Sequence, residues 1–296
     1  MIITTDIPTL PFKWINGIKC FTLIAEHITQ QILPDLFIQA LGYNGTTPGP
    51  TIIVHPGDYV QIRVINRLNE PTSIHWHGLD TPNNMDGVPP VEPTPAIAPG
   101  SYFDYHFCIT NPPGTHMYHS HVDSIRQDML GLVGAFIIED PTNMTAVNRD
   151  YVFMLHEFSL KGLEKEEVNS GMYELDPMTD NFNFFTINGR CYPFTSPIPV
   201  HIGERVRIRL GNIGMNAHPM HLHGHQFWVT ATDGNSLMTH QQYKKNTILV
   251  ASGETYDVEF VTNNFGKWPF HCHIPHHIAN NFTKPLGGMF TTIVYQ

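Results

Sequence analysis

The sequence has few charged residues, no long apolar run and only four cysteines, and each shortage excludes a class of protein. Charged residues make up 14% of the 296 residues, and the formal net charge is −10. This balance lacks the basic face that nucleic-acid binding requires. No apolar run approaches the roughly 20 residues that cross a bilayer. We therefore expect a globular protein with no nucleic-acid partner and no membrane span.

The first residues and the cysteines say little about the compartment. The segment 1–6 shows no charged, apolar and cleavage regions of a signal peptide. This is compatible with a cytoplasmic protein, and also with a secreted or periplasmic one from which a leader has been removed. Four cysteines do not form a disulfide framework. We expect Cys20, Cys108 and Cys191 to be buried free thiols in strands.

Turn formers are abundant and separate short strand-like segments. The chain has 23 glycines and 24 prolines, and 41% of its residues are hydrophobic. Segments 51–54, 134–138 and 257–261 are rich in β-branched and aromatic residues and are bounded by turn residues. No stretch shows a long apolar period of 3.6 residues. The pattern predicts an all-β sandwich or barrel architecture.

The chain contains an internal repeat. Residues 54–64 resemble residues 200–210, so the offset is 200 − 54 = 146. Histidine pairs recur at the same spacing or at 271 − 119 = 152. The matched pairs are His75/His77 with His221/His223, and His119/His121 with His271/His273. Two copies of one β domain are therefore predicted, at 1–145 and 146–296.

Histidine is the residue type in excess, with 19 histidines against 16 lysines and arginines. A His-x-His pair on a strand places both rings on one face. At this histidine content about one such pair is expected by chance, and the sequence has five. The fifth pair is His223/His225. Imidazole binds copper, zinc and iron, so this recurrence predicts metal sites.

Cys272 lies between His271 and His273, and this tripeptide is the most informative in the chain. On an extended strand its thiolate faces one side while both histidines face the other. A soft thiolate suits copper. The tripeptide therefore predicts two metal sites joined by a short covalent path, as an electron-transfer oxidase requires.

Four motifs resemble the copper signatures of multicopper oxidases, in the order of that family. The motifs are His75-Trp76-His77-Gly78, His119-Ser120-His121, His218-Pro219-Met220-His221-Leu222-His223-Gly224 and His271-Cys272-His273-Ile274-x-x-His277. The likeness includes residues 48–51 and 185–189. Because the chain has two repeats, it resembles the small two-domain laccases. The resemblance implies two cupredoxin-like Greek-key β-sandwich domains.

The resemblance also implies four coppers per functional unit. A mononuclear blue (type 1) copper would be held by His218, Cys272 and His277. The remaining ligands would form a trinuclear cluster of one type 2 and two type 3 coppers: His75 and His221 for type 2, His77, His119 and His273 for one type 3 copper, and His121, His223 and His271 for the other. In the repeat, the blue-copper ligands map to Thr72, Ser120 and Ile125. The blue copper is therefore expected in the second domain alone.

Two departures from the family pattern affect single residues. The weak axial ligand often lies ten positions after the cysteine, where this chain has Phe282, so segment 280–285 resembles an insertion. Met289 is then the favoured axial ligand, with Leu286 as the alternative. The family often places an acid directly after the last blue-copper histidine, and here Ile278 stands there. Asp86 matches the family's other acidic position and is assigned proton delivery.

The implied activity is that of a laccase-like oxidase. One-electron oxidation of a phenolic, aromatic or metal-ion donor at an exposed edge of His277 would be coupled to four-electron reduction of O2 to water. A copper nitrite reductase and a non-catalytic copper-binding protein are the alternatives. With no third domain to complete the cluster, we expect a homotrimer with copper clusters at its interfaces.

Overall fold

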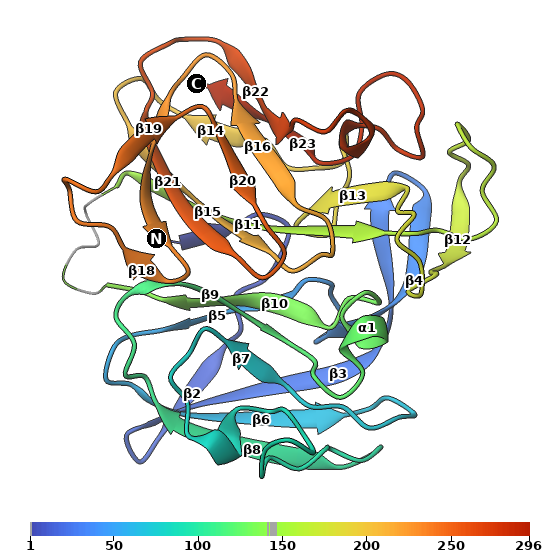
Figure 1. Cartoon of the computed structure of the whole chain (residues 1–296), viewed down its shortest axis with the longest axis vertical. Helices are drawn as coiled ribbons and strands as arrows, with labels where there is room; N and C mark the ends of the chain where they lie inside the picture. Colours follow the sequence, from blue (N-terminus) through green and yellow to red (C-terminus); the bar gives the residue numbers. More distant parts are fainter. Residues whose placement is uncertain (1, 141, 143–146) are drawn as a thin grey trace.

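Four β-sheets stacked in layers dominate the molecule (Figure 1). This computed structural model describes residues 2–140, 142 and 147–296. Two layers come mainly from the first half of the chain and two mainly from the second half. The predicted all-β class is confirmed.

The first half forms a sandwich of a six-stranded and a four-stranded sheet. The larger sheet consists of β2 (Phe12–Ile15), β3 (Ile18–Leu33), β4 (Leu36–Tyr43), β6 (Tyr59–Asn66), β8 (Tyr102–Cys108) and β12 (Gly171–Glu174). The smaller sheet runs β5 (Gly49–Val54), β10 (Val133–Ile138), β9 (Gly114–His119) and β7 (His75–His77). Alternate residues of β6 are buried, as expected for a strand with one face on the core. Trp76 and Tyr105 are fully buried between the two sheets.

The second half forms an eight-stranded and a five-stranded sheet. The larger one consists of β1 (Ile2–Thr4), β11 (Arg149–Phe158), β13 (Phe184–Ile187), β15 (Arg205–Asn212), β17 (Phe227–Thr232), β18 (Asn235–Ser236), β19 (Tyr243–Lys245) and β21 (Thr255–Val261). The smaller one runs β14 (Ile198–Val200), β23 (Phe290–Tyr295), β22 (Lys267–Cys272), β16 (His218–Leu222) and β20 (Thr247–Val250). Strands β16 and β22 pair antiparallel, which brings Met220 opposite Cys272 and His221 opposite His271.

Two short strands cross the predicted boundary between the domains. β1 pairs with β11 of the second half, and β12 pairs with β4 of the first half. The boundary at 145/146 lies outside the described residues, so it stays a prediction. Helical structure is short: α1 (Ser124–Gln127) and the 3-10 turns η1 (Asn83–Met85) and η2 (Pro275–Ile278). Across the described ranges, no helix has the length and apolar character needed to cross a bilayer.

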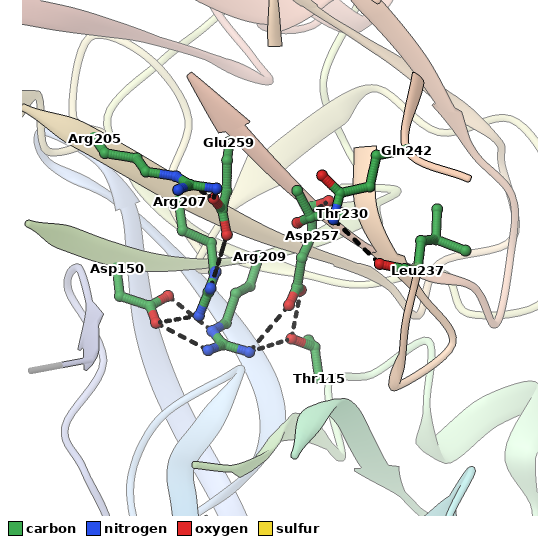
Figure 2. Close-up of polar contacts among 10 residues, drawn as sticks. All are labelled: Thr115, Asp150, Arg205, Arg207, Arg209, Thr230, Leu237, Gln242, Asp257 and Glu259. Atoms are coloured by element: carbon green, nitrogen blue, oxygen red, sulfur yellow. Dashed lines mark hydrogen bonds and ion pairs between the residues drawn. The ribbon is translucent and has the colours of Figure 1, made fainter. Parts of the chain in front are cut away.

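The two inner sheets pack against each other through an apolar cluster and a charged network. The cluster includes Met117 and Ile137 of the first half and Val152 and Met154 of the second. Beside it, Arg209 on β15 bonds Asp150 on β11, Asp257 on β21 and Thr115 on β9 (Figure 2). Thr115 belongs to the first half, so this buried guanidinium ties the two halves together.

Candidate metal centres

Three side chains of the second domain converge on one buried point. His218 begins β16, Cys272 ends β22, and His277 lies in the 3-10 turn η2 that follows. The Nδ1 atoms of His218 and His277 are 3.1 Å apart. Cys272 Sγ lies 3.9 Å from the first of these nitrogens and 3.4 Å from the second. The predicted blue-copper ligands are therefore brought together.

The chemistry of these donors fits copper. A thiolate with two imidazoles is the ligand set of blue-copper sites. Burial raises the pKa of Cys272 to about 12, so the thiol is protonated at neutral pH unless a cation displaces the proton. Burial, with the neighbouring rings of His218 and His276, lowers the pKa of His277 to about 3. This imidazole is therefore neutral and ready to act as a ligand at ordinary pH.

Glu157 orients His218, a role that no motif in the sequence indicates. Its fully buried Oε2 lies 3.1 Å from His218 Nε2, which leaves Nδ1 for a metal. The same carboxylate accepts the amides of Met215 and Asn216. Burial alone would raise the pKa of Glu157, but the hydrogen bond and charge of His218 outweigh it and lower the pKa. A buried negative charge thus stands one imidazole away from the metal position.

The two axial candidates lie in different surroundings. Met289 is fully buried in the same core cluster as Cys272, and its carbonyl accepts the Cys272 amide at 3.0 Å. The Met289 amide donates to the His277 carbonyl at 2.8 Å. Leu286 is 48% exposed. These positions favour Met289 over Leu286.

The four histidines of the first domain form one set. Rings of His77, His119 and His121 lie 5.7, 5.3 and 5.5 Å from the His75 ring. The Nδ1 atom of His77 faces Nε2 of His119 at 3.3 Å. The strands β7 and β9 produce this arrangement, because their register places His75 opposite His119. Burial, with His119 and His75, lowers the pKa of His77 to about 4, so its ring is neutral.

The four histidines of the second domain form a matching set. His223 and His271 approach each other through their Nε2 atoms at 2.9 Å. The His221 ring lies 4.8 Å from the His223 ring and 5.5 Å from the His273 ring. Each predicted type 3 group thus contains one of the two close pairs, His77/His119 or His223/His271.

Hydrogen bonds fix which ring nitrogen is free in both sets. The Nδ1 atoms of four histidines each face a backbone carbonyl, which can only accept, so Nδ1 carries the proton and Nε2 is available. These are His75 on Asp86, His119 on Ser120, His221 on Asn246 and His271 on Cys272. Such outer hydrogen bonds are typical of metal-binding histidines.

The two sets do not meet within one chain. Ring contacts join members of each set, and among the described residues none joins a ring of one set to a ring of the other. The second-domain segment beside His77 is the turn at Gly253, where an added Cβ would lie 3.4 Å from His77 Cε1. Each set is also partly accessible: His75 and His223 are half-buried and His273 is exposed.

Acidic residues surround the first set. Asp86 Oδ2 lies 3.3 Å from His75 Nδ1, so the predicted proton-delivery residue is in contact with a ligand. Burial and the neighbouring Asp86 raise the pKa of Glu92, which bonds the Asp86 carboxyl. Asp128 Oδ2 lies 3.1 Å from His119 Nδ1, and its Oδ1 is buried without a partner. Glu92 and Asp128 follow the histidine motifs in the sequence, but only the fold shows these contacts.

The first-domain counterpart of the blue site is a closed hydrogen-bonded group. Thr72 and Ser120 both donate to Gln127 Oε1, at 2.8 and 2.5 Å. Ile125 is 66% exposed and lies outside this group. In the part of the chain that the structure describes, two groups could hold a metal through three side chains: His75/His77/His119 and His218/Cys272/His277.

Two expectations need correction. His277 is 2% exposed, so it does not offer a donor the exposed edge expected from the sequence. Phe185 stacks on its ring at 3.9 Å and covers one face. The three other cysteines are free, as expected, but only Cys191 is buried; Cys108 is exposed, because it ends β8 with its side chain outward.

Comparisons with known proteins agree with this geometry. Sequence profiles described as multicopper oxidase match residues 27–143 and 164–286. The multicopper oxidase MmcO of Mycobacterium tuberculosis is 30% identical over 259 residues, covering 78% of this chain and 49% of the relative. Laccase-1 of Cryptococcus neoformans is 33% identical over 239 residues, covering 72% and 37%. The chain thus spans half or less of the length of these relatives.

The blue copper oxidase of Nitrosomonas europaea has a similar solved structure. Its TM-score is 0.81 at 32% identity, over 93% of this chain and 85% of that one. The likeness confirms the cupredoxin-like fold that was expected. A copper nitrite reductase of the same organism is more distant, at 22% identity, and shares the fold alone. The two profile matches cover most of the sequence, and the chain belongs to the multicopper oxidase family.

Proposed function

We propose that this protein is a laccase-like multicopper oxidase that couples four one-electron oxidations of a donor to the reduction of O2 to two waters. The observation that carries the proposal is the position of Cys272 between two histidines of the second set. Its sulfur faces His218 and His277, while His271 and His273 face the opposite side of β22. Bound copper would supply the electron transfer and the oxygen chemistry.

The backbone of Cys272 offers a short route between the two proposed sites. His271 Nδ1 donates to the Cys272 carbonyl at 2.7 Å. Two paths therefore lead from the Cys272 sulfur to the His271 ring. One follows the covalent backbone, and the other crosses the hydrogen bond from His271 Nδ1 to the Cys272 carbonyl. The chain's contribution is to hold these groups rigidly in a buried strand, so that little reorganisation accompanies each transfer.

The first four-histidine set would hold its coppers together with the second set of a neighbouring subunit. This follows from the separation of the two sets in one chain and from their partial exposure. A hollow of about 940 Å³ lies beside His221 and is lined by Trp228 and Lys244, and it could receive a neighbouring subunit. A head-to-tail contact of this kind closes into a ring of three subunits when each contact rotates the next subunit by one third of a turn. We propose a homotrimer with three interfacial clusters and four coppers per functional unit, as in the two-domain relatives that the sequence resembles.

Asp86 is the proposed proton-delivery group at this cluster. Its carboxylate contacts His75, accepts a hydrogen bond from the Thr81 hydroxyl at 2.8 Å and shares a hydrogen bond with Glu92. Asp86→Asn keeps the size of the side chain but removes the proton carrier. Steady-state O2 uptake by this variant should fall across the pH range; uptake equal to that of the parent would exclude the role.

Met289 is the proposed axial ligand of the blue copper. Its burial beside Cys272 and its two backbone bonds to the blue-site residues support this choice. Met289→Leu should raise the reduction potential of the blue site, because a weak donor that stabilises Cu(II) is lost. An unchanged potential and visible spectrum would exclude Met289.

The decisive test of the function is Cys272→Ser. The variant reloaded with copper should lose the blue absorption band and its oxidase turnover, because a hydroxyl does not replace the thiolate ligand. Turnover of O2 at the parent's rate would reject the proposal. Parallel assays of the parent distinguish the alternatives: nitrite reduction without O2 uptake would favour a nitrite reductase, and bound copper without turnover a copper-binding protein.

A further inference from the structure

His277 is the blue-site ligand next to the protein surface, but its ring is covered. Phe185 stacks on one face with an interplanar angle of 15°, and the residue is 2% exposed. The neighbouring His276 is exposed, and its ring centre lies 4.5 Å from that of His277 at an angle of 87°. The nearest accessible ring to the blue site is therefore that of His276.

Phe282 extends this aromatic contact outward. Its ring is stacked with His276, at 5.9 Å between centres and 15° between planes. The ammonium of Lys165 lies 4.9 Å from the centre of the Phe282 ring. The rings of His277, His276 and Phe282 thus form a continuous series from the buried ligand to a surface where Lys165 lies among exposed glutamates. We call His276, Phe282 and Lys165 the outer platform.

The backbone at Phe282 is held in a conformation that bulky residues rarely adopt. Asn281 and Phe282 have φ of 48° and 63°, in the left-handed region. Asn281 is fixed there because its Nδ2 donates to the Glu164 and Glu167 carbonyls, both at 2.7 Å. Its carbonyl also accepts the Glu166 amide at 3.0 Å. Strained residues held by several contacts are concentrated at functional sites.

These contacts account for two sequence features that the copper sites leave unexplained. Segment 280–285 departs from the family pattern. The long connection 159–183 between β11 and β13 contains one short strand, β12, and long connections of this kind often have a role of their own. In the structure the first places Phe282 over His276, and the second supplies Lys165 and the carbonyls that hold Asn281. The two segments build the outer platform together.

We propose that the reducing donor docks on the outer platform as a planar aromatic molecule, and that its electrons pass through His276 to His277. This inference rests on the proposed oxidase function. A phenol that stacks here would give one electron to a copper held at the blue site, reducing Cu(II) to Cu(I). It would release its proton to water and leave as a phenoxyl radical. The stacked rings favour a planar aromatic donor over a bare metal ion such as Cu(I) or Fe(II), which has no ring to stack. The Lys165 ammonium beside the Phe282 ring offers a hydrogen-bond donor to an oxygen on that aromatic ring.

The test uses the copper-loaded protein without O2. The rate at which 2,6-dimethoxyphenol bleaches the blue band is compared between the parent, His276→Ala, Phe282→Leu and a control, Tyr102→Ala. Tyr102 is also an exposed ring under a cation, with the Arg63 guanidinium carbon 4.3 Å from its centre, but it lies on β8 of the first domain. Dithionite serves as a second, small inorganic reductant.

Both platform variants should bleach about tenfold more slowly with the phenol, as expected when about 1.4 kcal/mol of aromatic contact is lost. The copper content and the position of the blue band of both variants should match the parent, and so should the rate of Phe282→Leu with dithionite. Tyr102→Ala should match the parent throughout. Phenol rates equal to the parent in both variants would overturn the proposal. If His276→Ala loses copper because it disturbs His277, the proposal is judged on the phenol rate of Phe282→Leu alone. A rate equal to the parent's then overturns it.

A binding measurement separates docking from turnover. The redox-inert probe 1,3-dimethoxybenzene should bind the parent and bind Phe282→Leu about threefold to tenfold more weakly, by nuclear magnetic resonance titration. Equal affinity in the two proteins would contradict the platform. A parent without a blue band and without O2 uptake would instead reject the oxidase function on which the proposal rests.

Discussion

At the residue scale, the blue site depends on a buried carboxylate as well as on its three ligands. Glu157 is fully enclosed and accepts three hydrogen bonds, from His218 and from the amides of Met215 and Asn216. A carboxylate so well supplied with donors stays ionised although it is buried. Its charge should stabilise the oxidised, more positive state of a copper held by His218.

Glu157→Gln is therefore expected to raise the reduction potential of the blue site. The Glu157 carboxylate and the copper position are separated by one imidazole ring. At an effective dielectric constant of about 20, the attraction between the two charges is about 2 kcal/mol, and its loss corresponds to a potential shift of roughly 100 mV. Redox titration of the blue band measures the shift. Glu204→Gln is the control, because Glu204 pairs with Arg149 instead of a ligand. Equal potentials in parent and Glu157→Gln would show that the charge does not act on the site.

At the element scale, one turn connects the predicted proton-delivery residue to a metal ligand. Gly87 follows Asp86 with φ of 90°, and its carbonyl accepts the Ser73 hydroxyl at 2.6 Å. A Cβ at Gly87 would collide with the carbonyl of Ile74, directly before His75. Glycine is required here both for the left-handed conformation and for the close approach of two backbones.

Gly87→Ala should displace His75 and Asp86 and so reduce copper binding in the first-domain set. We expect loss of the type 2 copper signal in electron paramagnetic resonance, with the blue band retained, because the blue ligands all lie in the second domain. Gly100→Ala is a matched control: its φ is 72°, but an added Cβ meets nothing within 4 Å. Equal copper contents in both variants would exclude a role for the Gly87 turn.

At the scale of the whole molecule, a charged network on the eight-stranded sheet reaches the first half through the bond of Arg209 to Thr115. Arg209 is 5% exposed and satisfies both Asp150 and Asp257, while Arg207 and Arg205 share Glu259 (Figure 2). Removing one partner of a buried ion pair leaves an unpaired buried charge. Arg209 therefore contributes to the stability of the second half and to its contact with the first.

Arg209→Leu should lower the free energy of unfolding by about 3–5 kcal/mol. Arg205→Leu, whose parent side chain is 53% exposed, should lower it by about 1 kcal/mol or less. Denaturant titration of both variants measures the difference. Similar losses in the two would mean that the network contributes no more than surface ion pairs do.

The copper-free protein should also become less stable in acid. The pKa values of His77 and His277, about 4 and about 3, lie below that of an unfolded histidine because both rings are buried. Between pH 6.5 and these values the unfolded chain binds more protons than the folded one, so stability falls as the pH is lowered. Denaturant titrations of the copper-free protein at several pH values measure this. His77→Gln should reduce the dependence of the unfolding free energy on pH between about pH 6.5 and pH 4. An unchanged dependence would show that burial of His77 does not cause the loss of stability.

The sequence by itself determined the fold class and the family, and it predicted the grouping of the ligands. His-x-His on a strand and Cys272 between two histidines place side chains on known faces, because the strand period of two is local geometry. It also predicted an insertion at 280–285. These features depend only on neighbours along the chain, so no contact between distant segments was needed to read them.

Only the tertiary structure decided which distant groups meet these ligands. Glu157 reaches His218 across 61 residues, Asp128 reaches His119 through a turn, and Phe185 covers the His277 ring that the sequence had left exposed. Such contacts arise when sheets pack face to face, and the alternation of residues along a strand does not specify which partner lies on the facing sheet.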